Sequence, residues 1–170
     1  MENSIPQIIS KETGKLTLVT SGEDMQQFIG WLLIIFPGIL FIGQIISSIN
    51  FPLAQRIGLQ EDPKETDTLL QRAEKYVAYW DLVTMGWLPL AGILMVMNNS
   101  VWPLIAFFGG AIYFDTAGRE AAKILSFKHE GIRIGSKKQQ HFFFSTYIIM
   151  ALISIIVLVY STLAIYHDMQ

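Results

Sequence analysis

Three long stretches of the chain contain no charged residue, and each is rich in apolar side chains. They run over 25–55, 82–114 and 142–166 and are 31, 33 and 25 residues long. A helix that crosses the hydrocarbon core of a bilayer needs about 20 predominantly apolar residues. The first and third stretches therefore each predict one membrane-spanning helix, at about 27–50 and 142–166.

The middle stretch is too long for a single crossing. At about 1.5 Å per residue it would reach roughly 50 Å, against a hydrocarbon core of about 30 Å. It contains its own break, an Asn-Asn-Ser run at 98–100, which is followed by Pro103. Asn and Ser favour turns and helix caps, and Pro is tolerated in a first helical turn. We therefore expect a tight helical hairpin, with membrane helices at about 76–97 and 101–118.

These four helices predict an all-α fold, an integral membrane four-helix bundle over 27–170. The residues before it, 1–26, are polar and predict an N-terminal tail with no cleavable signal peptide, because charged side chains are scattered through it. Within that tail, 15–20 reads Lys-Leu-Thr-Leu-Val-Thr, which is strand-like but has no visible partner strand.

Basic residues are distributed unevenly between the two ends of the predicted bundle. The loops 52–75 and 119–141 hold four and six Lys or Arg residues, the N-terminal tail holds two, and the hairpin turn and C-terminus hold none. Lys and Arg accumulate in cytoplasmic loops. Both loops are therefore predicted to be cytoplasmic and both termini to lie outside. Without a targeting peptide, we expect the cell inner (plasma) membrane.

Helical patterns continue from the membrane into both predicted cytoplasmic loops. Asp62 and Pro63 resemble an N-cap followed by Pro at the first helical position, so the second membrane helix is predicted to begin about three turns inside the cytoplasm. The third helix continues through 119–125, which consists almost entirely of good helix formers. It is predicted to stop between His129 and Gly131, because Gly favours helix C-termini.

Two carboxylates lie at equal distances from the hairpin turn. Asp81 is 17 residues before Asn98 and Asp115 is 16 after Asn99, so in antiparallel helices both lie roughly 25 Å below the outer surface. Arg119 follows Asp115 at i+4, on the same helix face. Other polar residues expected near this level are Gln44, Ser47, Ser48, Thr84, Tyr113, Thr116, Thr146 and Tyr147.

This cluster has a functional and a structural interpretation. Ionisable groups inside a membrane are costly and usually handle protons, ions or polar substrates. Alternatively, Asp81 and Asp115 are close enough to the interface to be hydrated, and pair with Arg119 or Lys123 to fix the hairpin register. The cost of a charge falls near the interface, so this alternative needs no special function.

Small residues and prolines mark contacts within the predicted bundle. Ala106 and Gly110 form a small-xxx-small pair that would let two helix backbones approach closely, most simply inside the bundle. Pro37 and Pro89 are expected to kink the first and second membrane helices.

Several kinds of chemistry are excluded by composition. There is no cysteine, which excludes disulfides and thiol catalysis. The three histidines lack metal-ligand spacing, and no His or Lys lies in a predicted span, which excludes an intramembrane bis-His haem or a retinal Schiff base. We therefore expect no metal and no cofactor. The net charge of −2 suggests no nucleic-acid partner.

Basic residues of the second loop could bind anionic lipid headgroups, although ordinary topogenic charge explains them equally well. These residues are Lys123, Lys128, Arg133, Lys137 and Lys138.

Three functions are compatible with these observations. The first is a non-enzymatic accessory or regulatory subunit of a membrane complex, acting through helix–helix contacts; its partners would be the lipid bilayer and another membrane protein or a second copy of the chain. The second is a small proton- or ion-coupled transporter or channel that uses Asp81 and Asp115, with Arg119 as counter-charge. The third and weakest is an enzyme acting on lipid at the inner leaflet, since no nucleophile or metal set is visible.

Overall fold

The computed structural model describes the backbone of residues 7–168 and the side chains of residues 23–167, and this part of the chain is helical with no β-strand. The helices are α1 (Gln7–Ile49), α2 (Phe51–Arg56), α3 (Thr68–Thr84), α4 (Trp87–Val96), α5 (Trp102–His129) and α6 (Lys137–Asp168).

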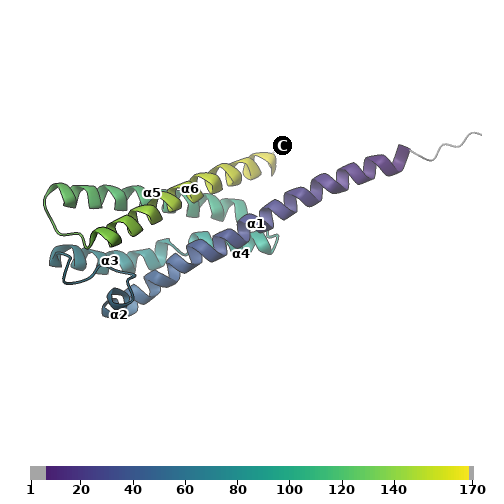
Figure 1. Cartoon of the computed structure of the whole chain (residues 1–170). Helices are drawn as coiled ribbons and strands as arrows, with labels where there is room; N and C mark the ends of the chain where they lie inside the picture. Colours follow the sequence, from purple (N-terminus) through teal and green to yellow (C-terminus); the bar gives the residue numbers. More distant parts are fainter. Residues whose placement is uncertain (1–6, 169–170) are drawn as a thin grey trace, which may run out of the picture.

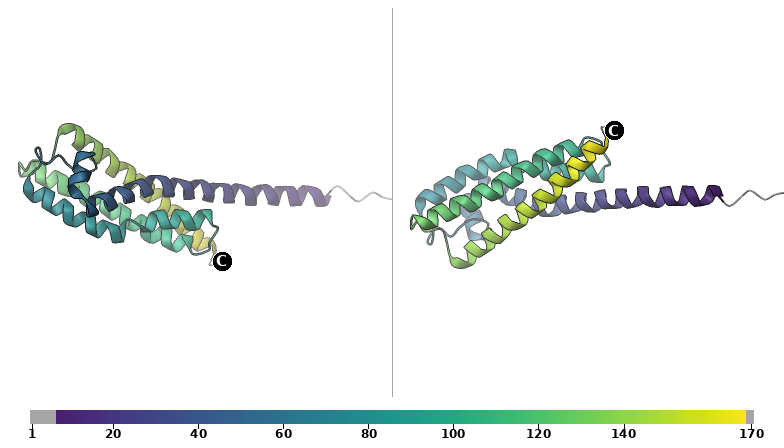
Figure 2. Two further views of the ribbon diagram at one scale, coloured as in Figure 1. Left: turned by 90° about the horizontal axis from the view of Figure 1, so that it is seen from below. Right: turned by 90° about the horizontal axis from the view of Figure 1, so that it is seen from above.

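The long helices run alternately up and down (Figure 1). α1 lies antiparallel to the consecutive helices α3 and α4, α5 returns beside α4, and α6 packs along α5. The α4–α5 turn and the end of α6 lie at one end of the molecule, and the α2–α3 and α5–α6 connections at the other. The N-terminal half of α1 projects beyond the turn in every view (Figure 2).

Three helical segments in the described part are long and apolar enough to cross a membrane. They are Glu23–Ile49, Thr68–Val96 and Lys137–His167, and they contain most of the expected spans 27–50, 76–97 and 142–166. The expected span 101–118 lies in α5, which is not among them because its inner half carries Asp115, Arg119, Glu120 and Lys123.

The predicted hairpin at 98–100 is confirmed. α4 ends at Val96 and α5 begins at Trp102 with a proline in its first turn. Asn98 takes a positive φ of 52°, which Asn tolerates better than most residues. The Asn99 side-chain oxygen accepts a hydrogen bond from the Val101 amide at 3.0 Å and so closes the turn.

Two local predictions were wrong. The strand-like segment 15–20 lies inside α1, which runs without a break through the expected tail boundary at residue 26, because a nucleated helix gains one hydrogen bond for each residue added. The N-cap of α3 is Asp67, whose carboxylate accepts from the Leu69 amide, so α3 begins later than expected. Asp62 caps a turn instead, accepting from the Lys64 amide at 2.8 Å.

The second predicted span is interrupted between α3 and α4 at residues 85 and 86. Pro89 causes this interruption, because it has no amide to donate to the Met85 carbonyl one turn earlier. The Tyr113 hydroxyl of α5 lies 3.1 Å from that oxygen and 3.3 Å from the Pro37 carbonyl oxygen of α1. A buried tyrosine thus joins α1, α3 and α5 at the interruption.

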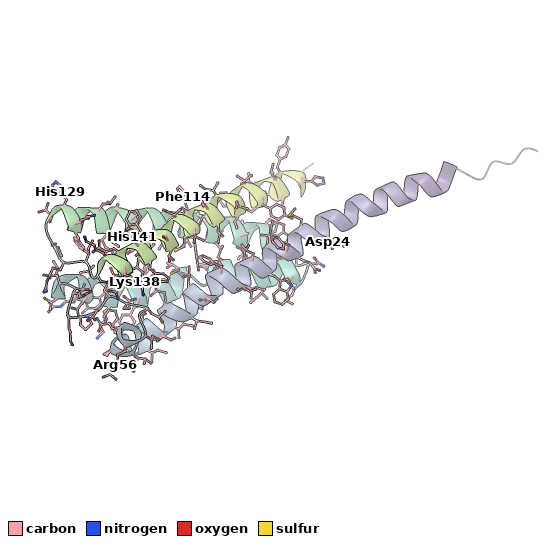
Figure 3. All side chains as sticks on the ribbon, viewed as in Figure 1. Asp24, Arg56, Phe114, His129, Lys138 and His141 are labelled. Atoms are coloured by element: carbon pink, nitrogen blue, oxygen red, sulfur yellow. The ribbon has the colours of Figure 1, made fainter. Side chains whose placement is uncertain are left out.

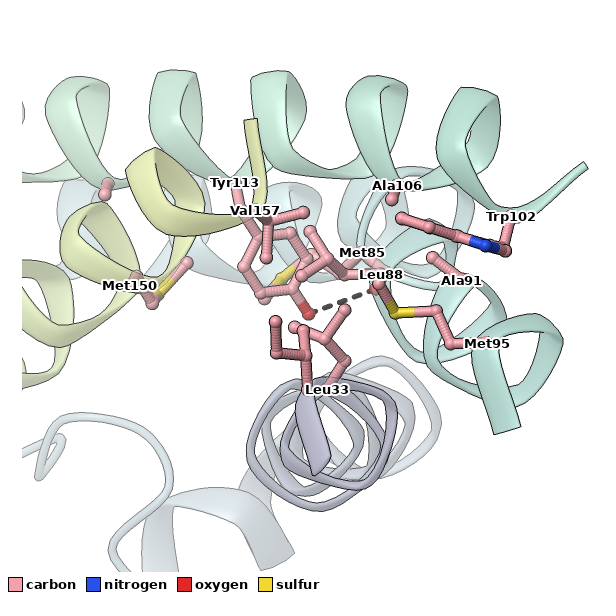
Figure 4. Close-up of a cluster of buried hydrophobic side chains, with 12 residues drawn as sticks. Leu33, Met85, Leu88, Ala91, Met95, Trp102, Ala106, Tyr113, Met150 and Val157 are labelled. Atoms are coloured by element: carbon pink, nitrogen blue, oxygen red, sulfur yellow. Dashed lines mark hydrogen bonds between the residues drawn. The ribbon is translucent and has the colours of Figure 1, made fainter. Parts of the chain in front are cut away.

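Apolar side chains fill the half of the molecule nearest the α4–α5 turn (Figure 4). Glycines let the helix backbones come close there. A Cβ on Gly92 of α4 would lie 2.6 Å from the Gly30 carbonyl oxygen of α1, and one on Gly109 of α5 would lie 3.0 Å from the Leu88 amide nitrogen. The small residues therefore serve contacts within this chain.

The two connections at the opposite end are tied together. Thr66 and Ile134 form an isolated antiparallel bridge, and the Asp67 amide donates to the Arg133 carbonyl at 2.9 Å. Gly131, with a φ of +70°, follows the end of α5 at His129, where the helix was predicted to stop.

Candidate functional site

A cavity of about 190 Å³ lies between α1, α3, α5 and α6, in the half of the molecule nearest the α2–α3 and α5–α6 connections. This volume has room for several waters. We call it the acidic cavity. Its polar lining residues are Gln44, Ser47, Gln60, Glu61, Glu74, Asp81, Thr116, Glu120, Thr146 and Tyr147.

Asp81 and Gln44 reach the acidic cavity from opposite helices. Asp81 lies on the buried face of α3 and is only 2% exposed. It is seven residues after Glu74, and this spacing of about two helical turns puts both carboxylates on one side of α3. Asp81 Oδ1 and Gln44 Oε1 are buried without a hydrogen-bond partner.

Lys123 joins two of the glutamates that line the acidic cavity. Its Nζ lies 2.6 Å from Glu74 Oε1 and forms a second ion pair with Glu120. Glu74 is on α3 and both other residues are on α5, so this triad connects the two helices. The Lys123 side chain is only 18% exposed, which makes the pairing a buried one.

Glu61 enters the cavity from the α2–α3 connection, where hydrogen bonds hold the local backbone. The Gln55 side-chain amide donates to the Glu61 carbonyl at 3.2 Å, and the Gln60 amide donates to the Ser47 hydroxyl of α1 at 3.1 Å. Burial raises the pKa of the Glu61 carboxyl above its ordinary value of 4.5. A backbone hydrogen bond and the Lys123 charge oppose that increase, and the Glu120 charge adds to it.

Negative charge in the acidic cavity exceeds the positive charge that the protein supplies. Four carboxyl groups line it, and Lys123 is the ammonium group paired with two of them. Burying an ionised carboxylate is costly unless a partner compensates for it. The cavity therefore favours the uptake of protons or of a further cation.

Asp115 and Arg119 lie outside the acidic cavity. The Asp115 side chain is 73% exposed, and its Oδ2 lies 3.7 Å from Arg119 Nε. A helix turns by about 100° per residue, so Asp115 is about 200° away from Tyr113, which faces the core. The two predicted carboxylates thus do not share one site.

Three further predicted residues also fall outside the cavity lining, and the first of them, Ser48, donates to the Ile45 carbonyl of its own helix at 2.9 Å. Tyr113 lies just beyond the lining, at the interruption between α3 and α4. The Thr84 hydroxyl donates to the Trp80 carbonyl at 3.2 Å, one turn back on its own helix. Of the expected polar cluster, the structure brings together Gln44, Ser47, Asp81, Thr116, Thr146 and Tyr147.

A second, basic pocket of about 1020 Å³ lies beside the α5–α6 connection. Its cationic lining residues are Lys64, Lys128, Arg133 and Lys137. Lys138 is exposed at the same end of the molecule (Figure 3). Lys123, the fifth residue expected to bind headgroups, is paired with glutamates in the interior.

Sequence reasoning missed Glu61, Glu74 and Glu120 because each lies in a charged stretch that looked like a solvated loop. Periodicity carried a signal for two of them. Glu74 precedes Asp81 by seven residues, and Glu120 follows Tyr113 by seven, so each shares a helix face with a buried residue. Glu61 had no such signal, since its burial depends on how the α2–α3 connection folds back.

The carboxylates of the acidic cavity are not arranged as metal ligands. Among the described residues, no group of three His, Cys, Asp or Glu side chains is placed to hold a metal ion. No family model matches the chain, and neither does any curated protein or solved structure. The chemistry of the acidic cavity is thus the main guide to function.

Proposed function

We propose that this protein is a small multi-pass membrane transporter or channel that takes up protons or cations in the acidic cavity. The observation that carries the proposal is a group of four carboxyls around one ammonium: Glu61, Asp81 and Glu120 are buried, and the Glu74 side chain is 12% exposed. Carboxylates in such a group are costly unless protons or a further cation neutralise them. Ionisable residues buried within a membrane protein commonly mark ion pathways and proton relays.

The membrane arrangement that we propose has four crossings, with α5 as the third. Since α5 folds back beside α4 at the hairpin turn, a membrane around α3 and α4 would also enclose its first half. The outer side chains of that half suit lipid. They are Leu104, Phe107, Phe108 and Phe114. The basic loops would face the cytoplasm and both termini the outside of the inner membrane, following the positive-inside rule.

An accessory role through helix contacts has less support. The small residues that suggested it, Gly92, Gly109 and Gly110 among them, are in close contact with α1, α4 and α6 of the same chain. They are therefore already used within the molecule. An enzyme acting on lipid would need an activated nucleophile or a metal set. The acidic cavity is lined by hydroxyl, amide and carboxyl side chains but by no histidine or cysteine, and the described residues contain no group of metal ligands.

Reconstitution into liposomes tests the proposal. We expect wild-type protein to speed the decay of an imposed pH gradient, or to admit sodium or potassium, relative to empty liposomes. Asp81→Asn and Glu120→Gln should reduce that flux by tenfold or more, because each removes a cavity carboxylate. Asp115→Asn is the matched control, since it removes an exposed carboxylate outside the cavity and should leave flux unchanged. Wild-type flux equal to that of empty liposomes would refute the proposal.

A further inference from the structure

Two buried acceptor atoms without a hydrogen-bond partner belong to residues that line the same cavity. Among the described residues, three buried side-chain atoms lack a hydrogen-bond partner, and two of them, Gln44 Oε1 and Asp81 Oδ1, belong to residues that line the acidic cavity. The great majority of buried polar atoms in proteins have a partner. Both atoms accept hydrogen bonds, so a ligand that satisfies them must present N–H or O–H donors.

The carboxyl groups around Asp81 and Gln44 indicate that the ligand carries a positive charge. Asp81 is an acid and so are Glu61, Glu74 and Glu120 in the same lining, so a neutral donor leaves most of the negative charge uncompensated. Lys123 already shows how such a site holds an ammonium: its Nζ lies between the carboxylates of Glu74 and Glu120. A second ammonium at Asp81 would repeat this arrangement.

The remaining wall of the acidic cavity is apolar and aromatic. α6 contributes Phe142, Phe143 and Tyr147, and α1 contributes Ile39 and Leu40. Ile39 and Phe142 are also more than half exposed at the molecular surface, so the cavity extends to the lipid-facing side between α1 and α6. Aromatic faces attract cations as well as apolar groups. The wall therefore fits a ligand with an apolar body.

We infer that the acidic cavity binds a protonated primary or secondary amine with an apolar or aromatic body. Its N–H groups donate to Asp81 and Gln44. Its apolar body lies against α6, where the cavity reaches the lipid-facing side between α1 and α6. This inference rests on the proposed function and names the class of cation. A quaternary ammonium carries the same charge but has no N–H, so it cannot satisfy the two acceptors.

A matched pair of ligands tests this directly. Benzylammonium and benzyltrimethylammonium share a ring and a charge and differ in their N–H donors. Calorimetric titration of the full chain in lipid nanodiscs should show benzylammonium binding at least tenfold more tightly, since only its N–H groups can donate to the two acceptors. Asp81→Asn and Gln44→Leu should each weaken benzylammonium binding and reduce this preference, and Asp115→Asn should not.

The outcomes separate the inference from the proposed function. Equal binding of the two ligands, or binding of neither to a protein that still carries protons or sodium, overturns the inference and leaves the proposed function standing. If liposomes that contain the wild-type protein show no more flux than empty liposomes, the proposed function itself is overturned. The ligand pair is compared on wild-type protein, so the result does not depend on whether any variant folds.

Discussion

The Tyr113 hydroxyl lies 3.1 Å from the Met85 carbonyl oxygen, whose helical donor would have been the amide of residue 89, a proline. Figure 4 shows the ring reaching across from α5, and both residues are buried. Tyr113→Phe leaves this carbonyl without a donor, and an unsatisfied buried acceptor costs about 1–3 kcal/mol. We expect a lower melting temperature in detergent.

The control for this substitution is Tyr166→Phe, at an exposed position near the end of α6. A double-mutant cycle makes the test more specific, because Pro89→Ala restores an amide that can donate a hydrogen bond to the Met85 carbonyl oxygen. Tyr113→Phe should then cost less in the Pro89→Ala background. Equal costs in both backgrounds would show that the hydroxyl has no special relation to this carbonyl.

Lys123→Met should be among the most destabilising single changes in the molecule. It leaves Glu74 and Glu120 as buried carboxylates without their ammonium, and losing one partner of a buried pair costs about 3–5 kcal/mol. Thermal unfolding in detergent at neutral pH measures the loss. Lys128→Met, an exposed position on the same helix, is the control. Adding Glu120→Gln to Lys123→Met should recover part of the loss, and no recovery would contradict the triad.

Two glycine-to-alanine substitutions should have opposite effects. A Cβ at Gly92 meets the Gly30 carbonyl oxygen at 2.6 Å, so Gly92→Ala should force α1 and α4 apart at a cost of about 1–3 kcal/mol. A Cβ on Gly38, also within a long helix, would have no side chain and no other helix within 4 Å. Gly38→Ala should be neutral or stabilise by about 0.5–1 kcal/mol. Melting temperatures that fall equally would refute close α1–α4 packing.

Glu61→Gln should change how stability depends on pH. Because burial raises the pKa of Glu61 above 4.5, the folded state holds this proton more tightly than the unfolded state does. Its contribution to stability is therefore fully present below pH 4.5 and is lost as pH rises through the higher folded-state pKa. Each unit of increase in that pKa corresponds to about 1.4 kcal/mol.

Melting temperatures measured from pH 4 upwards test the Glu61 prediction. Wild-type protein should lose more stability towards neutral pH than Glu61→Gln, whose side chain does not ionise. Glu65→Gln, at an exposed position of the same connection, is the control and should follow the wild type. Parallel curves for wild type and Glu61→Gln would contradict the raised pKa.

The basic pocket leads to a lipid prediction. Added anionic phosphatidylglycerol should raise the melting temperature more than phosphatidylcholine does, and Arg133→Glu with Lys137→Glu should remove about half of that difference. Arg56→Glu changes charge at the same end of the molecule but outside this pocket (Figure 3). Arg56→Glu should leave the preference for phosphatidylglycerol unchanged. If it lowered this preference as much as the double variant does, the effect would come from general surface charge and not from the basic pocket.

The hairpin turn and the end of α5 could be predicted because each follows from local chemistry. The Asn-Asn-Ser run and Pro103 specify the turn whatever surrounds them. The N-cap of α3 was harder to assign, because Asp62 and Asp67 both have capping side chains. Which of the two caps the helix depends on the hydrogen bond from the Asp67 amide to the carbonyl of Arg133, a residue far away in sequence.

The candidate site was predictable only in part. Counting residues from the turn gives the distance of each carboxylate along its helix but not its direction around the helix axis. Asp81 points inward and Asp115, at matching depth by that count, points outward, because each belongs to a different face of its helix. Glu74, Glu120 and Lys123 could not be placed in the interior from the sequence, because each is buried only through its pairing with the others.

The acidic cavity ends against Met85 and Met150, which also belong to the packed apolar cluster that continues to the hairpin turn. On the proposed function, a cation that reached Asp81 would meet this apolar cluster, and the helices would have to repack for it to pass. Rearrangements of that size take microseconds to milliseconds. Transport by this fold would accordingly be that of a carrier with alternating access, saturable and steeply dependent on temperature.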